Sequence, residues 1–271
     1  MIGSGLSFRT VFISDIHLGS ADCQAGYLLD FLRATQCETL YLVGDIIDLI
    51  AMRRRTHWPQ SHTAVVKELV RKARAGTRVV YIPGNHDAEL RALSGSRWAG
   101  IGIRRSAVHR LDDGRRFLIA HGDEFDDRIP LRPILRAAGD LGHALLLRLN
   151  RDCNRARRRL GLRYWPLAVK LKERFGQRYA RAFELAVMRE VKRRGFDGYV
   201  GGHLHVAGIR RKGRVLYCND GDWVEHCTAL VEHPGGWLSL MQWTETQRVL
   251  MQAAPEPGVR DQARPSPAEA A

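Results

Sequence analysis

The sequence predicts an α/β protein, and three observations lead to this prediction. Short apolar runs rich in β-branched residues alternate with segments that carry apolar residues at helical spacing. Five of the strand-like runs end in a turn that carries Asp, Asn or His. After residue 205, β-like runs follow one another closely. Alternating strands and helices are typical of a sheet covered by helices, and closely spaced strands predict an antiparallel meander that packs on it.

The individual elements follow from these patterns. Strands are predicted at 10–13, 40–43, 79–82, 117–120 and 199–200, and covering helices at 24–34 and 64–75. The meander comprises the runs at 215–218, 228–231 and 237–240. Together these elements predict a domain over residues 8–250. Residues 251–271 are rich in Pro, Ala, Glu and Gln and predict a disordered tail.

An insert at about residues 125–195 separates the fourth and fifth strands, and a segment of this length needs structure of its own. Apolar spacing predicts a long helix from Leu131 to Leu149 and a later helix around Phe183 and Val187. A cluster of Arg side chains lies between them and is followed by an aromatic pair. We interpret the insert as a helical lid, basic on one side and apolar on the other. The alternative is an ordinary helical hairpin with a solvated Arg face.

Composition narrows the class of protein. The 271 residues are 45% hydrophobic, which is enough for one substantial core. Lys and Arg outnumber Asp and Glu by 43 to 29, for a formal charge of +14, so we expect anionic partners such as nucleotides, nucleic acid or acidic lipid. Five Cys without a Cys-x-x-Cys pair indicate reduced thiols. With neither a secretory signal nor a long apolar run, we expect a cytoplasmic protein.

The polar turns predict a metal site. The carboxyl ends of strands are where open α/β sheets place their ligands, and five turns there carry Asp, Asn and His. The candidate metal ligands are Asp15, His17, Asp45, Asn85, His121, His203 and His205. Oxygen and nitrogen donors without sulfur favour a hard or borderline divalent metal. Seven ligands suit two ions, with Asp45 shared. Two such ions would clamp the attacking and leaving oxygens of a phosphate ester and supply a bridging hydroxide.

Further side chains in these turns have assignable roles. His86 follows Asn85 and is placed to donate a hydrogen bond or a proton to the phosphoryl or leaving oxygen. We assign Asp87 to orienting His86, with a helix cap as the alternative. Asp48 is expected to support the ligands or to cap a helix. The Asn219–Trp223 turn could also approach the site, through Asn219 or Asp222.

These motifs carry a resemblance to a known family. Asp15-x-His17, Gly44-Asp45-x-x-Asp48, Gly84-Asn85-His86-Asp87, His121-Gly122-Asp123 and Gly202-His203-x-His205 resemble, in order, the signature of the calcineurin-like metallophosphoesterases. The resemblance implies a four-layer α/β/β/α sandwich with two divalent metal ions, most often manganese, with iron or zinc as alternatives. It places one ion on Asp15, His17, Asp45 and His205, and the other on Asp45, Asn85, His121 and His203.

Within that family the chain is most similar to the bacterial UDP-2,3-diacylglucosamine diphosphatases. The similarity lies in Ile13–Leu18, Leu42–Asp45, the His121-Gly122-Asp123 turn and the insert. It implies cleavage of a pyrophosphate at the cytoplasmic face of the inner membrane, in lipid A synthesis, with release of UMP. The best-known members have Arg where this chain has His86, which leaves a sister group with another substrate as an alternative.

The insert and one turn supply the substrate-binding candidates. These are Asp123, Arg157, Arg158, Arg159, Tyr164 and Trp165. A basic and apolar surface of this kind fits a lipid-bearing phosphate ester and a peripheral position on anionic lipid. Two other functions stay open. One is a soluble phosphodiesterase or phosphatase that acts on nucleotides or nucleic acid, and the other is a non-catalytic protein that binds lipid or nucleic acid.

Overall fold

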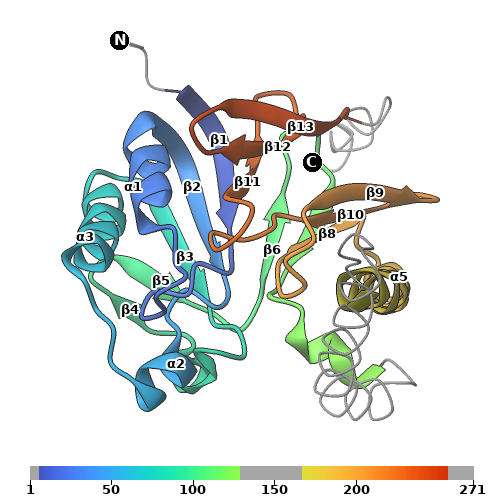
Figure 1. Cartoon of the computed structure of the whole chain (residues 1–271). Helices are drawn as coiled ribbons and strands as arrows, with labels where there is room; N and C mark the ends of the chain where they lie inside the picture. The colour runs from blue at the N-terminus through green and yellow to red at the C-terminus, as the bar shows by residue number, and fades with distance from the viewer. Residues whose placement is uncertain (1–5, 129–166, 256–271) are drawn as a thin grey trace, which may run out of the picture. The chain divides into compact units, whose positions relative to one another are not determined.

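The structure is a computed structural model that describes residues 6–128 and 167–255 (Figure 1). The chain divides into two compact units, one of residues Met1–Asp123 and Met188–Ala271, the other of Glu124–Val187. All the strands of the described residues belong to the larger unit, where they form two sheets. The protein is therefore a mixed α/β protein, as the sequence predicted.

The first sheet has eight strands in the order β13-β12-β11-β1-β2-β3-β5-β4. Its parallel centre consists of β1 (Leu6–Ile13), β2 (Thr35–Val43), β3 (Arg78–Ile82) and β5 (Ile101–Ile103). Antiparallel strands flank this centre: β11 (Thr228–Glu232), β12 (Leu238–Trp243) and β13 (Gln247–Ala253) on one side, and β4 (Arg97–Trp98) on the other.

The second sheet has five strands in the order β6-β7-β8-β10-β9. They are β6 (Ala107–Arg110), β7 (Arg116–Ile119), β8 (Gly198–Gly201), β9 (Gly208–Lys212) and β10 (Val215–Asn219). The strands β7, β8 and β10 are parallel to one another, whereas β6 and β9 are antiparallel edge strands.

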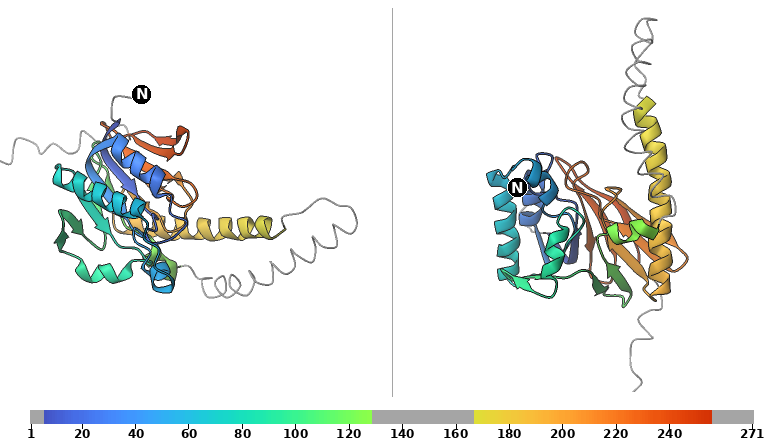
Figure 2. Two further views of the ribbon diagram at one scale, coloured as in Figure 1. Left: turned by 60° about the vertical axis from the view of Figure 1, so that its left-hand side comes forward. Right: turned by 90° about the horizontal axis from the view of Figure 1, so that it is seen from below.

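The central strands are buried on both faces, which explains their continuous apolar runs. In β1, Val11 and Ile13 belong to the core under the helices, while Phe12 belongs to a second core between the sheets. Successive side chains of a strand point to opposite faces, so a strand between two cores has no polar alternation. The inter-sheet core also includes Phe117 and Val200 of the second sheet. The larger unit thus contains helix, sheet and sheet layers in succession (Figure 2).

Two amphipathic helices cover the outer face of the first sheet (Figure 1). They are α1 (Ala25–Ala34), which buries Leu28, Phe31 and Leu32, and α3 (Gln60–Arg74), which buries Val65 and Leu69. The remaining helical elements are α2 (Leu49–Arg54), η1 (Ala88–Leu93), η2 (Asp123–Arg128) and α5 (Leu167–Arg193). None of the helices that the structure describes combines the length and the apolar content needed to span a membrane.

Three details differ from the sequence-based expectation. The runs at 215–218, 228–231 and 237–240 do not form one meander, because β10 joins the second sheet parallel to β8 while β11 and β12 extend the first. Strand β13 runs through Ala253, so residues 251–253 belong to the sheet and not to a tail. The predicted 131–149 helix lies outside the described residues, whereas α5 carries the predicted later helix.

Candidate metal centre and active site

The loops after β1 and β2 bring the first candidate ligands together. The Asp15 amide donates to the carbonyl of Gly44 at 3.0 Å, and the His17 amide donates to the carbonyl of Asp45 at 2.9 Å. Since β1 and β2 are adjacent parallel strands, their carboxyl ends meet at one edge of the sheet. The backbone itself therefore holds the Asp15–His17 and Asp45 turns against each other.

The backbone at these positions is unusual. Five of the seven predicted ligands, namely Asp15, His17, Asp45, His203 and His205, have left-handed φ angles between 48° and 68°. Such angles are uncommon for residues other than Gly and cost free energy that the surrounding structure must supply. The backbone at Asp15, His17, His203 and His205 is therefore not extended. Backbone strain concentrated in this way marks a functional site.

Two glycines let the turns approach the ligand side chains. A Cβ atom added at Gly84 would clash with Asp45 Oδ1, and one added at Gly202 would clash with Asp15 Oδ2 and Ser14 Oγ. Both positions have ordinary φ angles, so it is space rather than backbone conformation that requires Gly here. The turns after β3 and β8 thus pack directly on the two carboxylates.

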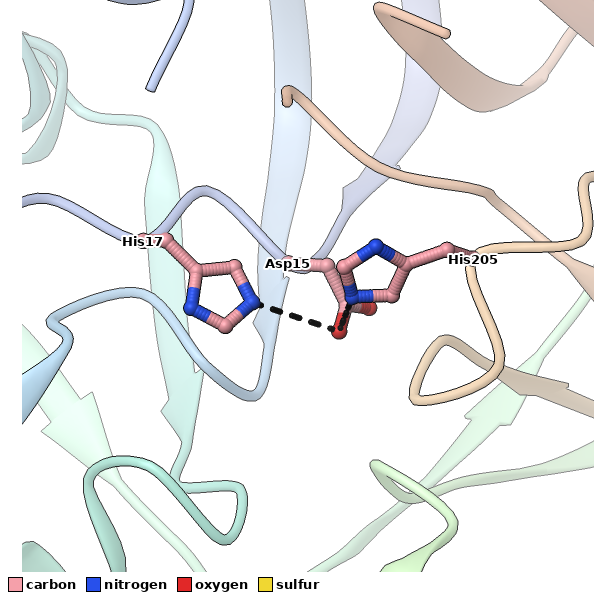
Figure 3. A group of neighbouring side chains, drawn as sticks. All are labelled: Asp15, His17 and His205. Carbon is pink, nitrogen blue, oxygen red and sulfur yellow. Dashed lines mark ion pairs between the residues drawn. The ribbon is translucent and has the colours of Figure 1, made fainter. Parts of the chain in front are cut away.

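Asp15, His17 and His205 form the first group of candidate ligands (Figure 3). One ligand atom of each lies within 4.8 Å of the others. Asp15 Oδ1 is 3.0 Å from His205 Nε2 and 4.0 Å from His17 Nε2. The three residues come from both sheets, since His205 follows β8. Three of the four predicted ligands of the first ion therefore lie together.

Asp15, Asp45 and His121 form a second group with the same 4.8 Å separation. His121 Nε2 is 3.3 Å from Asp45 Oδ2 and 3.3 Å from Asn85 Oδ1. The His203 ring packs edge-on against the His121 ring at 5.2 Å. The predicted ligands of the second ion are thus neighbours. Asp15, rather than Asp45, is the residue that these two groups share.

Hydrogen bonds define which ring nitrogen faces a metal. The Nδ1 atom of His121 donates to the carbonyl of Val43 at 2.9 Å, because a carbonyl oxygen only accepts. The Nδ1 atom of His17 donates to Asp48 Oδ2 at 2.9 Å. Metal-binding histidines characteristically donate one ring N–H to a carbonyl or carboxylate and bind the metal through the other nitrogen. Nε2 is therefore the nitrogen that each ring has left for a metal ion.

The polar atoms of the centre fit a divalent cation. Asp15 Oδ1 and His17 Nε2 are buried without a hydrogen bond of good geometry, although buried polar atoms are nearly always paired. Oxygen and imidazole nitrogen are the donors that manganese, iron and zinc accept. The free cysteines of the described residues are not among these groups. The donor set therefore fits two divalent ions, as predicted.

The carboxyl and imidazole groups of the centre shift one another's pKa values. Burial raises the pKa of Asp15 and of Asp45, but hydrogen bonds and nearby His charges outweigh it, so both pKa values are lowered. Burial lowers the pKa of His121 and of His205. Asp45 raises the pKa of His121 by more than this, and Asp15 does the same for His205, so both pKa values are raised. The carboxylates thus stabilise positive charge beside these imidazole rings. A bound metal ion would supply that charge in place of protons.

His86 is held by Asp48 and not by Asp87. The His86 Nδ1 atom lies 3.0 Å from Asp48 Oδ1, and its backbone amide donates to Asp45 Oδ1 at 2.8 Å. Asp48 therefore positions both His86 and His17, and it also caps α2 by accepting from the Ala51 amide. The His86 side chain is 31% exposed.

Asp87 has a structural role, which corrects its assignment to catalysis. Its carboxylate accepts from the Gly84 amide at 2.6 Å, from the Ile46 amide at 2.8 Å and from the Tyr81 hydroxyl at 2.5 Å. Asp87 is fully buried, and its side chain does not cap η1. It therefore locks the turn after β3 onto the turn after β2, and its effect on His86 is indirect.

Asp123 joins two loops. Both of its carboxylate oxygens accept from Arg91 Nη2, at 2.7 and 2.8 Å, and Arg91 also donates to the carbonyl of Pro83. Substrate binding by Asp123 stays a prediction. The other predicted substrate-binding residues, Arg157, Arg158, Arg159, Tyr164 and Trp165, lie outside the described residues.

The turn after β10 contributes a residue that the sequence analysis passed over. Asn219 Nδ2 donates to the carbonyl of Gly202, and Asp222 Oδ1 accepts from the amides of Val224 and Glu225. Between them, Asp220 is fully buried and hydrogen-bonded to Ser14. Asn219 thus supports the turn that carries His203, and Asp222 stabilises its own turn. A run of Asp and Gly after a strand was the available signal, but it did not single out Asp220.

Two packed mixed sheets with a carboxylate and imidazole centre at their strand ends define a metal-dependent hydrolase. Comparison with protein families makes this more specific, because residues 8–207 match the model of the calcineurin-like phosphoesterases. The chain belongs to the calcineurin-like phosphoesterase family, and it is a metal-dependent phosphoesterase.

Comparison with solved structures gives matches of low sequence identity. The Escherichia coli phosphoesterase Yfce is 16% identical over 91% of this chain and 99% of its own, with a TM-score of 0.49. Vps29 of Entamoeba histolytica in complex with zinc is 12% identical over 90% and 97%, with a TM-score of 0.46. An archaeal phosphodiesterase is 15% identical over 89% and 99%, with a TM-score of 0.39. A search of curated proteins found no match.

Proposed function

We propose that this phosphoesterase uses two divalent metal ions to hydrolyse a pyrophosphate or phosphodiester. The observation that carries the proposal is the convergence of the two groups of candidate ligands, which share Asp15, next to a histidine that a carboxylate holds in place. Divalent ions bound there would activate a water molecule and neutralise the charge of the phosphate.

The residues of the chain have distinct tasks in this reaction. As the resemblance implies, Asp15, His17, Asp45 and His205 would hold one ion, and Asp45, Asn85, His121 and His203 the other. His86 donates a proton or a hydrogen bond from Nε2 to the oxygen of the leaving group, since its Nδ1 atom is bound to Asp48. Asp48 keeps the ring in this orientation by holding its Nδ1 atom.

The substrate that we propose is UDP-2,3-diacylglucosamine or a related membrane-associated lipid phosphate, cleaved to UMP and a lipid monophosphate. Three short motifs and the position of the insert support it by resemblance, and the formal charge of +14 fits an anionic lipid surface. His86 replaces the Arg of the best-known diphosphatases, so a related lipid ester is part of the proposal. Manganese is the proposed metal, and the cytoplasmic face of the inner membrane is the proposed location.

The test is a release assay with purified protein and Mn²⁺. We expect UMP from UDP-2,3-diacylglucosamine, no UMP with Asp45→Ala, and full activity with His57→Ala, because His57 is exposed and outside the centre. Turnover of a cyclic nucleotide or of DNA without release of UMP would replace the lipid substrate by a nucleotide or nucleic acid.

The nucleotide or nucleic-acid phosphodiesterase is the second candidate function. The same positive charge supports it, because Lys and Arg that contact phosphates make binding salt-dependent. If this function is correct, the KM for DNA will rise steeply between low and physiological salt. A non-catalytic binding protein would instead leave the cellular phenotype of Asp45→Ala unchanged.

A further inference from the structure

Ser14 lies between two carboxyl groups that come from different sheets. Its Oγ atom is 2.6 Å from Asp15 Oδ2 and 2.6 Å from Asp220 Oδ1, with the carbonyl of Gly221 at 3.1 Å. Ser14 follows β1 and Asp220 follows β10, and all three polar side chains are at most 1% exposed. The three residues thus form a short hydrogen-bonded chain that ends on a candidate metal ligand.

The protons in this chain can be counted. A serine hydroxyl has one proton, whereas each of its two carboxyl neighbours lies at the distance of a short O–H···O hydrogen bond. Ser14 can donate to only one of them. At the other contact the carboxyl group must carry a proton and donate it to Ser14 Oγ, because two oxygens with no proton between them would repel each other at 2.6 Å. One of the two carboxyl groups is therefore a neutral acid.

The surroundings identify Asp220 as the neutral acid. Asp15 Oδ2 also accepts from the His203 amide at 2.9 Å, and Asp15 Oδ1 faces His205, so the environment of Asp15 favours its charged form. Asp220 Oδ2 is buried without a hydrogen bond. An ionised Asp220 would therefore leave charge on an unpaired buried oxygen, which is far more costly than an unpaired neutral carbonyl.

The charges near Asp220 act in the same direction. Burial raises the pKa of Asp220 well above its usual value, and the negative charge of Asp15 raises it further. The hydrogen bond to Ser14 and the positive charge of His121 lower the pKa but do not outweigh burial. Its backbone is fixed by hydrogen bonds to the Gly201 carbonyl and from the Thr228 hydroxyl. These contacts hold the carboxyl group against Ser14.

We propose that Asp220 is a neutral carboxylic acid that donates its proton to Ser14 Oγ, so that Ser14 donates its own proton to Asp15 Oδ2. Asp220 is then a positioning residue that acts through Ser14. Asp15 Oδ2 receives two hydrogen bonds, while Asp15 Oδ1 receives none of good geometry and keeps its lone pairs for a metal ion. This last consequence rests on the proposed function, whereas the protonation state does not.

Infrared spectroscopy of the metal-free protein tests the protonation state directly. At pH 8, where ordinary carboxyl groups are ionised, we expect the carbonyl stretch of a carboxylic acid in the wild-type protein and its loss in Asp220→Asn. The matched control is Asp222→Asn, because Asp222 is a buried carboxylate on the same turn. Burial raises the pKa of Asp222, but hydrogen bonds from the Glu225 amide and from His226 outweigh burial and lower it. Asp222→Asn should keep the band. A wild-type spectrum without the band overturns the proposal, as does a band that survives in Asp220→Asn.

Metal affinity tests the positioning role. An Asn amide donates to Ser14 Oγ as the acid does, so Asp220→Asn should retain the Mn²⁺ affinity that Asp220→Ala loses. Removal of a group that orients a metal ligand raises the Kd about 10–100-fold, which we expect for Asp220→Ala and for Ser14→Ala. In the Ser14→Ala background, Asp220→Ala should have little further effect, because the chain is already broken.

The outcomes separate this proposal from the proposed function. If Asp220→Asn weakens Mn²⁺ binding as much as Asp220→Ala, the residue acts as a carboxylate and the inference is wrong. If Asp220→Ala does not fold, the infrared comparison of wild type and Asp220→Asn still decides. A wild-type protein that shows the infrared band but binds no Mn²⁺ would refute the metal function and leave the protonation state intact.

Discussion

Replacement of His86 by Ala is the most direct test of the active site. His86 Nδ1 is bound to Asp48 at 3.0 Å, so Nε2 is the proposed proton donor. Loss of a general acid lowers turnover by about 10²–10⁴-fold. This corresponds to about 2.7–5.4 kcal/mol in the activation free energy, at about 1.36 kcal/mol for each tenfold step. Metal content should be unchanged, because the predicted ligands of both ions are other residues.

The leaving group makes this prediction sharper. A nitrophenolate leaves without a proton, so the loss in His86→Ala should be small with bis-nitrophenyl phosphate and large with an ester of an ordinary alcohol. The assay is kcat for both esters, with metal content measured by plasma mass spectrometry. His57→Ala serves as the matched control, since His57 is exposed and lies outside the centre.

Two results would refute the reasoning. His17, Asp48 and His86 could themselves hold an ion, with one ligand atom of each within 4.8 Å of the others. If His86→Ala loses metal, His86 is a ligand and not a proton donor. If kcat falls equally for both esters while metal is retained, His86 stabilises the phosphoryl group and does not protonate the leaving oxygen.

Three further predictions concern the need for metal, the close approach of Gly202 to Asp15, and the pH dependence of stability. Chelation should abolish turnover, and added Mn²⁺ should restore it. The wild-type protein should bind two ions per chain and Asp45→Ala fewer. Full turnover of the metal-free protein would contradict the proposed metal site. Gly202→Ala should lose metal and activity, since its Cβ would clash with Asp15 Oδ2, whereas Gly26→Ala, with open space in α1, should stabilise the fold by about 0.5–1 kcal/mol. Equal metal content in both variants would be evidence against the close approach. Buried Glu232 accepts from Arg9 of the same sheet at 2.6 Å and from His109 of the other sheet at 2.8 Å. Glu232→Gln should therefore cost about 3 kcal/mol in denaturant unfolding, and exposed Glu225→Gln close to nothing. Burial raises the pKa of Glu232, but hydrogen bonds from His109 and Thr10 lower it more, so the folded pKa lies below the usual 4.5. Its contribution should therefore be complete above about pH 4.5 and disappear as pH falls through the lower folded value; a Glu232→Gln difference that is constant down to pH 3 would disprove this account.

Much of the fold could be predicted because the central strands lie between two cores. Their continuous apolar runs, such as Leu40–Val43, are a local signal that needs no knowledge of the partner strands. The strands after residue 205 gave the same local signal, but their sheet did not follow from it. β10 is followed by a turn that crosses to the first sheet before β11, and no residue spacing distinguishes that crossing from a hairpin.

The candidate site was predictable in its residues but not in its hydrogen bonds. The seven predicted ligands share the strand-end position, and the structure brings them together as neighbours. The role of Asp87 was misassigned because its neighbour in sequence, His86, is not its partner in space. Asp220 was passed over because its contact with Ser14 spans 206 positions.

The sequence by itself determined the α/β class, the strand ends and the set of donor atoms, because these depend on residue type and on spacing along one segment. Only the tertiary structure decided which sheet each later strand joins, which carboxylate holds His86, and which imidazole nitrogen is left for a metal. These features depend on contacts between turns that follow β1, β2, β3, β8 and β10. A hydrogen bond between such turns is selected by packing of the two sheets and leaves no local pattern in the chain.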